Sequence, residues 1–95
     1  KSGLWGQPAH LCRLGDGRLL CTYGYRKKPY GVRASISEDE GLTWSEPIII
    51  REDENISWDV GYPSSVLLSD TSVLTIYYFQ NNNKIRYIDS TTWML

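Results

Sequence analysis

The chain has 95 residues, a formal net charge of −1 and 22% charged side chains, a size and balance that suit one domain with no basic surface for nucleic acid and no acidic tail. Its longest apolar run, Ile48-Ile49-Ile50, is far too short to span a bilayer, and no signal peptide is visible. We therefore expect neither nucleic acid nor a membrane as a partner.

The first half of the chain alternates strands and turns, and no window shows sustained helical periodicity. Asp16-Gly17 predicts a two-residue hairpin turn, and a polar loop follows at Arg26–Gly31. A further turn precedes Thr43. The strands expected around these connections cover Ala9–Leu14, Arg18–Tyr25, Val32–Ser37 and Thr43–Ile50.

Two cysteines, Cys12 and Cys21, flank the first turn. A two-residue turn would place them opposite each other on the same face of the hairpin. A disulfide between them is conceivable but sterically awkward, and we favour two small buried hydrophobic residues. Because His10 is the single histidine and no C-x-x-C pair is present, we expect no metal and no cofactor.

The second half repeats the first after a polar loop at residues 51–61. Leu14–Tyr23 aligns with Leu68–Tyr77, and Arg33…Thr43-Trp44 aligns with Arg86…Thr92-Trp93. A repeat of about 50 residues with four strands is typical of β-propeller blades. We therefore expect an all-β fold in which residues 1–95 form one partial propeller domain, with one blade at about 7–50 and another at about 61–95. The strands expected in the second blade cover Tyr62–Leu68, Val73–Phe79, Lys84–Asp89 and Thr92–Leu95.

One eight-residue motif carries a family resemblance. Ser37-Glu38-Asp39-Glu40-Gly41-Leu42-Thr43-Trp44 fits S-x-D-x-G-x-T-W, which resembles the Asp box of sialidases and related propellers. Its residue types predict a folded turn, in which Asp39 accepts hydrogen bonds, Gly41 takes a positive φ and Trp44 packs beneath. We expect a structural role for Ser37, Asp39, Gly41, Thr43 and Trp44. Calcium binding by Asp39 with its neighbouring glutamates is the alternative.

The resemblance extends to other segments. Asp16-Gly17-Arg18-Leu19-Leu20 is similar to the D-G-x-L-L hairpin of sialidase-like blades. Gly61-Tyr62-Pro63-Ser64-Ser65 is similar to the A-Y-S-S stretch that carries the tyrosine nucleophile, although Gly61 and Pro63 depart from that pattern. The resemblance implies the C-terminal two-blade part of a six-bladed propeller, with a substrate pocket at the end away from the Asp box. The resemblance then places five residues near the pocket rim or the propeller axis: His10, Arg26, Trp58, Asp59 and Tyr62.

The chemistry of sialic acid suggests roles for these residues. Its carboxylate would repel a carboxylate nucleophile, whereas a neutral tyrosine avoids the repulsion, so Tyr62 is the candidate nucleophile. Arg26 and Arg33 are candidates for binding the substrate carboxylate. Each role has an alternative: Tyr62 as a core residue, Arg33 as a solvent-facing strand residue, Asp59 as an acid, an arginine partner or a loop cap. His10 is either a general base or a hydrogen-bonded structural residue.

Three functional interpretations follow. The first is a segment of a sialidase-like glycosidase that acts on a carbohydrate, without a complete site in this chain. The second is a non-catalytic lectin-like propeller formed by three copies, because two blades alone leave open edges and faces. The third is an inactive fragment, since the chain opens with Lys1 rather than Met. The sugar and the localisation are not specified, although an extracytoplasmic site is slightly favoured.

Overall fold

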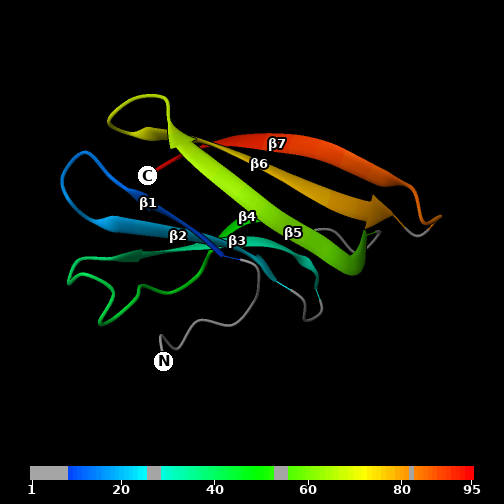
Figure 1. The fold of residues 1–95 in the computed structure, drawn as a ribbon, viewed down its shortest axis with the longest axis horizontal. Helices are drawn as coiled ribbons and strands as arrows, with labels where there is room; N and C mark the ends of the chain where they lie inside the picture. The colour runs from blue at the N-terminus through cyan, green and yellow to red at the C-terminus, as the bar shows by residue number, and fades with distance from the viewer. Residues whose placement is uncertain (1–8, 26–28, 53–55, 82) are drawn as a thin grey trace.

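The computed structural model describes residues 9–25, 29–52, 56–81 and 83–95, with the backbone alone described at 56–59. These residues form seven strands in two antiparallel sheets, which confirms the all-β prediction (Figure 1). The first sheet has the order β1-β2-β3-β4 and the second β5-β6-β7. No described segment forms a helix long and apolar enough to cross a membrane. The strand bounds are β1 Ala9–Arg13, β2 Leu19–Tyr25, β3 Gly31–Ser37, β4 Ile48–Glu52, β5 Ile56–Leu67, β6 Ser72–Asn81 and β7 Arg86–Met94.

The hairpin between β1 and β2 is longer than predicted. Arg13 pairs with Leu19, so residues 14–18 connect the strands instead of Asp16 and Gly17 alone. The backbone N–H of Leu14 donates to Arg18 O at 2.8 Å, and Gly17 adopts a φ of 95°. This register places Cys12 opposite Leu20 and Cys21 opposite Leu11, on different faces of the sheet. The prediction of one shared face was therefore wrong, and both thiols are free.

The pairing of β3 with β4 contains a bulge at Ile50. Val32 pairs with Arg51 but Arg33 pairs with Ile49, so one residue of β4 is extra. The bulge lets Ile50 and Arg51 both face the second sheet. β4 begins at Ile48 and not at Thr43 as predicted, because Pro47 has no N–H for the ladder.

The second sheet has three strands among the described residues, not the expected four. Lys84–Asp89 and Thr92–Leu95 were predicted as separate strands, but β7 runs without interruption from Arg86 to Met94. The segment Ser90-Thr91-Thr92 lacks the Asp-x-Gly of a folded turn, and threonine favours extended backbone. The register also corrects the repeat alignment. Arg33 lies opposite Tyr23 and Asp89 lies opposite Tyr77, so Asp89, not Arg86, is the counterpart of Arg33.

The core lies between the two sheets, and β5 runs beside β1, β2 and β3 (Figure 1). One apolar cluster joins Val32 of β3 to Val60, Tyr77 and Phe79 of the second sheet. The other joins Leu14, Leu20 and Ala34 of the first sheet to Val73 of β6. Since each cluster draws side chains from both sheets, neither sheet has a complete core of its own.

Polar contacts also link the sheets. Trp93 Nε1 donates to Thr75 Oγ1 at 2.9 Å, and Thr75 Oγ1 lies 2.8 Å from Ser65 Oγ. Ser65 Oγ in turn donates to Thr22 Oγ1 of the first sheet at 3.2 Å. Because the Ser65 proton is used toward Thr22, Thr75 must donate to Ser65, which fixes the direction of this hydroxyl chain.

Arg51 forms a second link, from β4 to the second sheet. Its Nη1 donates to Asp89 Oδ2 at 2.7 Å and to Tyr77 Oη at 3.3 Å. Its guanidinium carbon lies 4.2 Å from the centre of the Phe79 ring. The two sheets are thus joined at their centre by hydroxyls and at β4 and β7 by an ion pair.

Candidate functional site

The eight-residue motif forms a closed turn between β3 and β4. Asp39 Oδ1 accepts from Ser37 Oγ and from Thr43 N, each at 2.8 Å, and Asp39 Oδ2 accepts from Thr43 Oγ1 at 2.5 Å. Gly41 N donates to Ser37 Oγ at 2.8 Å, and Gly41 adopts a φ of 89°. The hydroxyl and backbone N–H of Thr43, helped by Ser37, lower the pKa of Asp39 to about 2. Asp39 therefore stays ionised and has its acceptor sites occupied by the turn itself.

The neighbours of Asp39 do not form a cation site. Glu40 pairs with Arg13 of β1, with its two oxygens 2.9 and 3.0 Å from the guanidinium nitrogens. Among the described residues, no group of three or more His, Cys, Asp and Glu side chains could hold a metal ion. Trp44 is half-buried, and its ring lies 3.7 Å from the position of a β-carbon at Gly41. The arrangement is that of a turn held by its own side chains.

Tyr62 has an unusual backbone and an exposed side chain. It follows Gly61 at a one-residue bulge, where Gly61 pairs with Tyr78 and Ser64 pairs with Ile76. Its φ is 47°, and its side chain is 67% exposed. A left-handed backbone is costly for a residue other than glycine, and such strain concentrates at functional sites. The bulge turns the Tyr62 side chain onto the outer face of the second sheet.

A shallow groove surrounds Tyr62. The Tyr62 and Tyr78 rings lie 5.3 Å apart at an angle of 54°. The groove has a volume of about 440 Å³. Its lining is mostly apolar, with one hydroxyl from Ser64, and we call it the tyrosine groove, formed by Tyr62, Ser64, Ile76, Tyr77, Tyr78 and Ile88. Of the groove residues, the sequence singled out Tyr62 alone. The alternation of side chains along β6 could also have predicted that Ile76 and Tyr78 share one face of the sheet.

Arg33 is buried, with 5% of its surface exposed, so the alternative of a solvent-facing residue was wrong. Its guanidinium donates to Glu52 Oε2 at 3.2 Å and to the carbonyls of Pro29 and Arg51. It also lies 4.4 Å from the centre of the Tyr25 ring. A substrate carboxylate would have to replace Glu52, so Arg33 is not a free anion-binding group in this conformation.

His10 of β1 connects the two sheets, because it forms a hydrogen bond with β5, the edge strand of the second sheet. Its Nδ1 accepts a hydrogen bond from the backbone N–H of Ser65 at 3.2 Å. This N–H points away from β6, at the open edge of β5, and so His10 supplies the acceptor that a neighbouring strand would otherwise give. The contact matches the structural alternative for His10.

The remaining candidates are described only in part. Arg26 lies outside the described residues, and Trp58 and Asp59 have their backbone in β5 while their side chains lie outside the described set. Arg33 faces away from the second sheet, and Tyr62 lies on the outer face of that sheet. The described structure therefore does not bring Tyr62 and Arg33 together.

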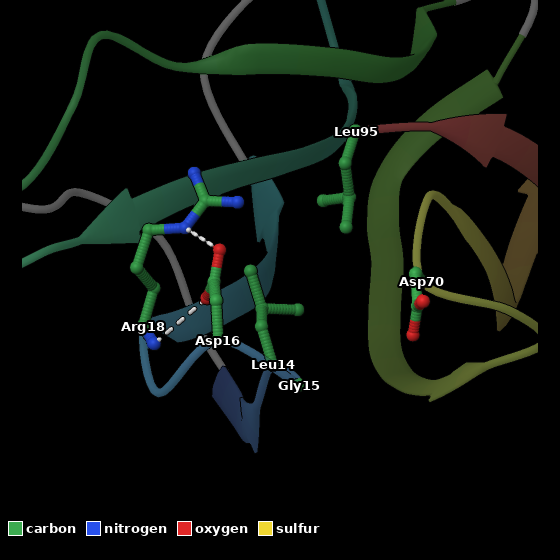
Figure 2. A pocket seen from close by; sticks show the side chains of 6 residues that line it. All are labelled: Leu14, Gly15, Asp16, Arg18, Asp70 and Leu95. Atoms are coloured by element: carbon green, nitrogen blue, oxygen red, sulfur yellow. Dashed lines mark hydrogen bonds and ion pairs between the residues drawn. The ribbon is translucent and has the colours of Figure 1, made fainter.

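A second hollow, which the sequence did not predict, lies at the end of the molecule that carries the first hairpin turn. It has a volume of about 320 Å³ and is lined by Leu14, Gly15, Asp16, Arg18, Asp70 and Leu95 (Figure 2). Figure 2 shows Asp16 and Arg18 on one side and Asp70 on the other. The backbone N–H of Arg18 and its guanidinium, 2.8 Å away, lower the pKa of Asp16. The Asp16 carboxylate therefore stabilises the hairpin turn to which it belongs.

Comparison with known proteins gives one informative likeness. No family model matches the chain, and no curated protein matches it. It is similar to the crystal structure of a protein of unknown function from Dyadobacter fermentans DSM 18053, with 39% sequence identity and a TM-score of 0.85. The match covers 97% of this chain but 26% of that one. The chain thus spans about a quarter of the length of this similar protein.

Proposed function

We propose that the chain is a two-blade segment of a sialidase-like β-propeller, the first sheet being one blade and the second sheet the next. Three features support the proposal: the closed turn of the eight-residue motif, the Asp-Gly hairpin before β2, and the stacking of two antiparallel sheets along β5. A similar protein almost four times as long leaves room for further blades in such a fold.

We further propose that the tyrosine groove binds a carbohydrate. The observation that carries this proposal is Tyr62, a strained and 67% exposed tyrosine beside a second tyrosine. A phenol ring offers an apolar face for the C–H side of a pyranose and a hydroxyl for hydrogen bonding. Ser64 adds a hydroxyl donor and acceptor at the groove wall.

In a longer protein the same tyrosine would serve glycoside hydrolysis. A tyrosine nucleophile attacks the anomeric carbon only when a base removes its phenolic proton, and a second acid must protonate the departing oxygen. No described carboxylate contacts Tyr62. The acid and base would therefore come from other blades, and we expect this chain alone to bind a sugar without hydrolysing it.

Saturation-transfer NMR on the purified chain tests the binding. An α-sialoside and a neutral galactoside serve as probes, and we expect weak binding with transfer to the sugar ring protons. Tyr62→Ala should weaken binding by about tenfold, which corresponds to about 1.4 kcal/mol. Tyr62→Phe should have a smaller effect, because it keeps the ring and removes only the hydroxyl.

Tyr87→Phe is the matched control. Tyr87 is also exposed but stacks on Phe79, away from the groove, at 5.3 Å between ring centres. Equal loss of binding in Tyr62→Ala and in the control, or no binding of either sugar to the wild type, would refute the proposal. Release of a fluorophore from a fluorogenic sialoside by the chain alone would contradict the expectation that its site is incomplete.

A further inference from the structure

Ser65 of β5 is held to the first sheet at two points. Its backbone N–H donates to His10 Nδ1 at 3.2 Å, and its hydroxyl donates to Thr22 Oγ1, also at 3.2 Å. His10 and Thr22 lie directly opposite each other on β1 and β2. One residue of the second sheet thus contacts two adjacent strands of the first, and these two contacts fix the position of its backbone and of its side chain.

The residues just before Ser65 form the bulge that exposes Tyr62. The regular pairing with β6 is interrupted between Gly61 and Ser64, and Pro63 has no N–H to donate to β6. Tyr62 keeps a φ of 47°, which a residue other than glycine retains only when the surrounding structure imposes it. The backbone on both sides of the interruption must therefore be fixed for Tyr62 to stay in place.

His10 supplies the fixed point on the C-terminal side of this bulge. Ser65 follows Tyr62 by three residues, and its N–H lies at the edge of β5 that faces away from β6. We propose that His10 is a positioning residue for the tyrosine groove: by accepting from Ser65, it holds β5 in the conformation that places the Tyr62 ring beside Tyr78. The inference deepens the proposed function, and its consequence for sugar affinity rests on that function.

The hydrogen bond between His10 and Ser65 requires a neutral imidazole. Because Nδ1 accepts, the single ring proton is on Nε2. An imidazolium carries a proton on both nitrogens, so its Nδ1–H would face the Ser65 N–H and the contact would be lost. Histidine takes up this second proton between about pH 8 and about pH 5. The tyrosine groove should therefore be formed above this range and lose its shape as the pH falls through it.

The strands around His10 carry few other titratable groups on the side that faces it. On its face of β1 and β2 the titratable side chain is Cys12, and thiols ionise at more alkaline pH. Residues 63–67 of β5 are uncharged. The ion pair of Arg51 with Asp89 lies at β4 and β7, and the strand order places β4 three strands, or about 14 Å, from β1. Among the side chains that the structure describes, His10 is therefore the group near β5 whose charge changes in this range.

A pH series followed by NMR on the isotope-labelled chain tests the inference. The Ser65 amide signal and the Tyr62 amide and ring signals should shift with the same midpoint as the His10 ring protons, between about pH 8 and about pH 5. The affinity for a neutral galactoside, whose own charge does not change, should fall by at least about tenfold over the same range. The Tyr62 signals decide the positioning role even if the sugar does not bind, so the inference and the proposed function fail separately.

His10→Asn is the conservative variant. Asparagine can place its side-chain oxygen at the position of Nδ1, accept from the Ser65 N–H and remain uncharged at every pH of the series. It should bind the galactoside within about threefold of the wild type at about pH 7.5 and remove the pH dependence of both the affinity and the Tyr62 signals. His10→Leu has no acceptor and should show weak binding and displaced Tyr62 signals throughout. Circular dichroism will show whether both variants fold.

Cys12→Ser is the matched control, because it changes the other titratable group on this face of β1 and leaves His10 and Ser65 in place. It should keep the pH profile of the wild type. Tyr62 signals that stay constant while those of His10 and Ser65 titrate would reduce His10 to a structural contact and overturn the inference. A pH dependence that survives in His10→Asn would do the same.

Discussion

Asp39 shows how one carboxylate organises a ten-residue connection. Both of its oxygens accept hydrogen bonds inside the turn, and all four residues that make the bonds of the turn belong to the S-x-D-x-G-x-T-W pattern: Ser37, Asp39, Gly41 and Thr43. The turn therefore depends on residues within eight positions of one another, and no distant segment is needed to explain it. Glu40, by contrast, is held by Arg13 from β1 and links the turn to the first strand.

The titration of Asp39 predicts acid sensitivity of the turn. Its pKa in the folded protein is about 2, below the ordinary value of 3.8, because it accepts hydrogen bonds as a carboxylate. A lowered pKa adds stability above the unfolded pKa, and this stability is lost as the pH falls from about 4 toward about 2. We expect the melting temperature to drop over this window and the drop to shrink in Asp39→Asn.

Glu38→Gln is the control for this prediction. Glu38 is exposed and next to Asp39, so the substitution removes a nearby charge without touching the turn bonds. Thermal melts followed by circular dichroism between pH 2 and 6 give the comparison. An acid transition that is unchanged in Asp39→Asn would show that other carboxylates cause it.

At the scale of strands, local sequence predicted most of the fold. Period-two alternation and the Asp-Gly turn located β1, β2, β3, β6 and the second half of β5, because these signals act within a few residues. The prediction of a polar loop over residues 51–61 was wrong, because β4 extends to Glu52 and β5 begins at Ile56. Two strands were predicted where β7 is continuous, because the four-strand pattern of the first half was extended to the second half. The segment Ser90-Thr91-Thr92 lacks the turn residues that would separate two strands. The register of the first hairpin was missed because Leu14 and Arg18 close it with a backbone bond that the dipeptide does not reveal.

The sequence predicted part of the candidate site, whereas the surroundings of Tyr62 and Arg33 depend on a bulge and on strand pairing. The sequence singled out Tyr62, but its exposure results from the extra residue between Gly61 and Ser64. Arg33 was expected to bind substrate or face solvent, yet Glu52 of β4 pairs with it. That contact depends on the pairing of β3 with β4, and side-chain alternation along one strand does not reveal it.

Substitution of Ser65 measures how much the polar contacts of β5 contribute to the stability of the fold. Its hydroxyl lies between Thr22 of β2 and Thr75 of β6, and the residue is 7% exposed. Ser65→Ala leaves two buried hydroxyls without their shared partner, so we expect a loss of about 1–3 kcal/mol in the free energy of unfolding. Urea denaturation measures this value.

Ser64→Ala is the adjacent control, because Ser64 is exposed on the outer face. It should change the free energy of unfolding by less than about 0.5 kcal/mol, the range of surface substitutions away from special features. A Ser65→Ala variant as stable as Ser64→Ala would mean that the hydroxyl chain contributes no net stability.

At the scale of the whole molecule, the two sheets share their buried core and are joined by polar contacts. Both apolar clusters cross between the sheets, and Arg51, His10 and Ser65 supply polar links at three separate places. A three-stranded or four-stranded sheet alone would expose one face of each cluster. The two sheets should therefore fold and unfold as one unit, even though the repeat suggests two separable halves.

Native-state hydrogen exchange, at a protein concentration where the chain is monomeric, tests whether the two sheets unfold as one unit. Leu20→Ala in β2 and Val73→Ala in β6 each remove a fully buried side chain from the same cluster, and each should cost about 2–4 kcal/mol. If the sheets unfold together, either variant lowers the opening free energy of the slowest amides in β2 and in β6 by the same amount. Protection lost in one sheet and retained in the other would show two independent units. The shared clusters predict the equal loss, because neither sheet can keep its buried face once the other has unfolded.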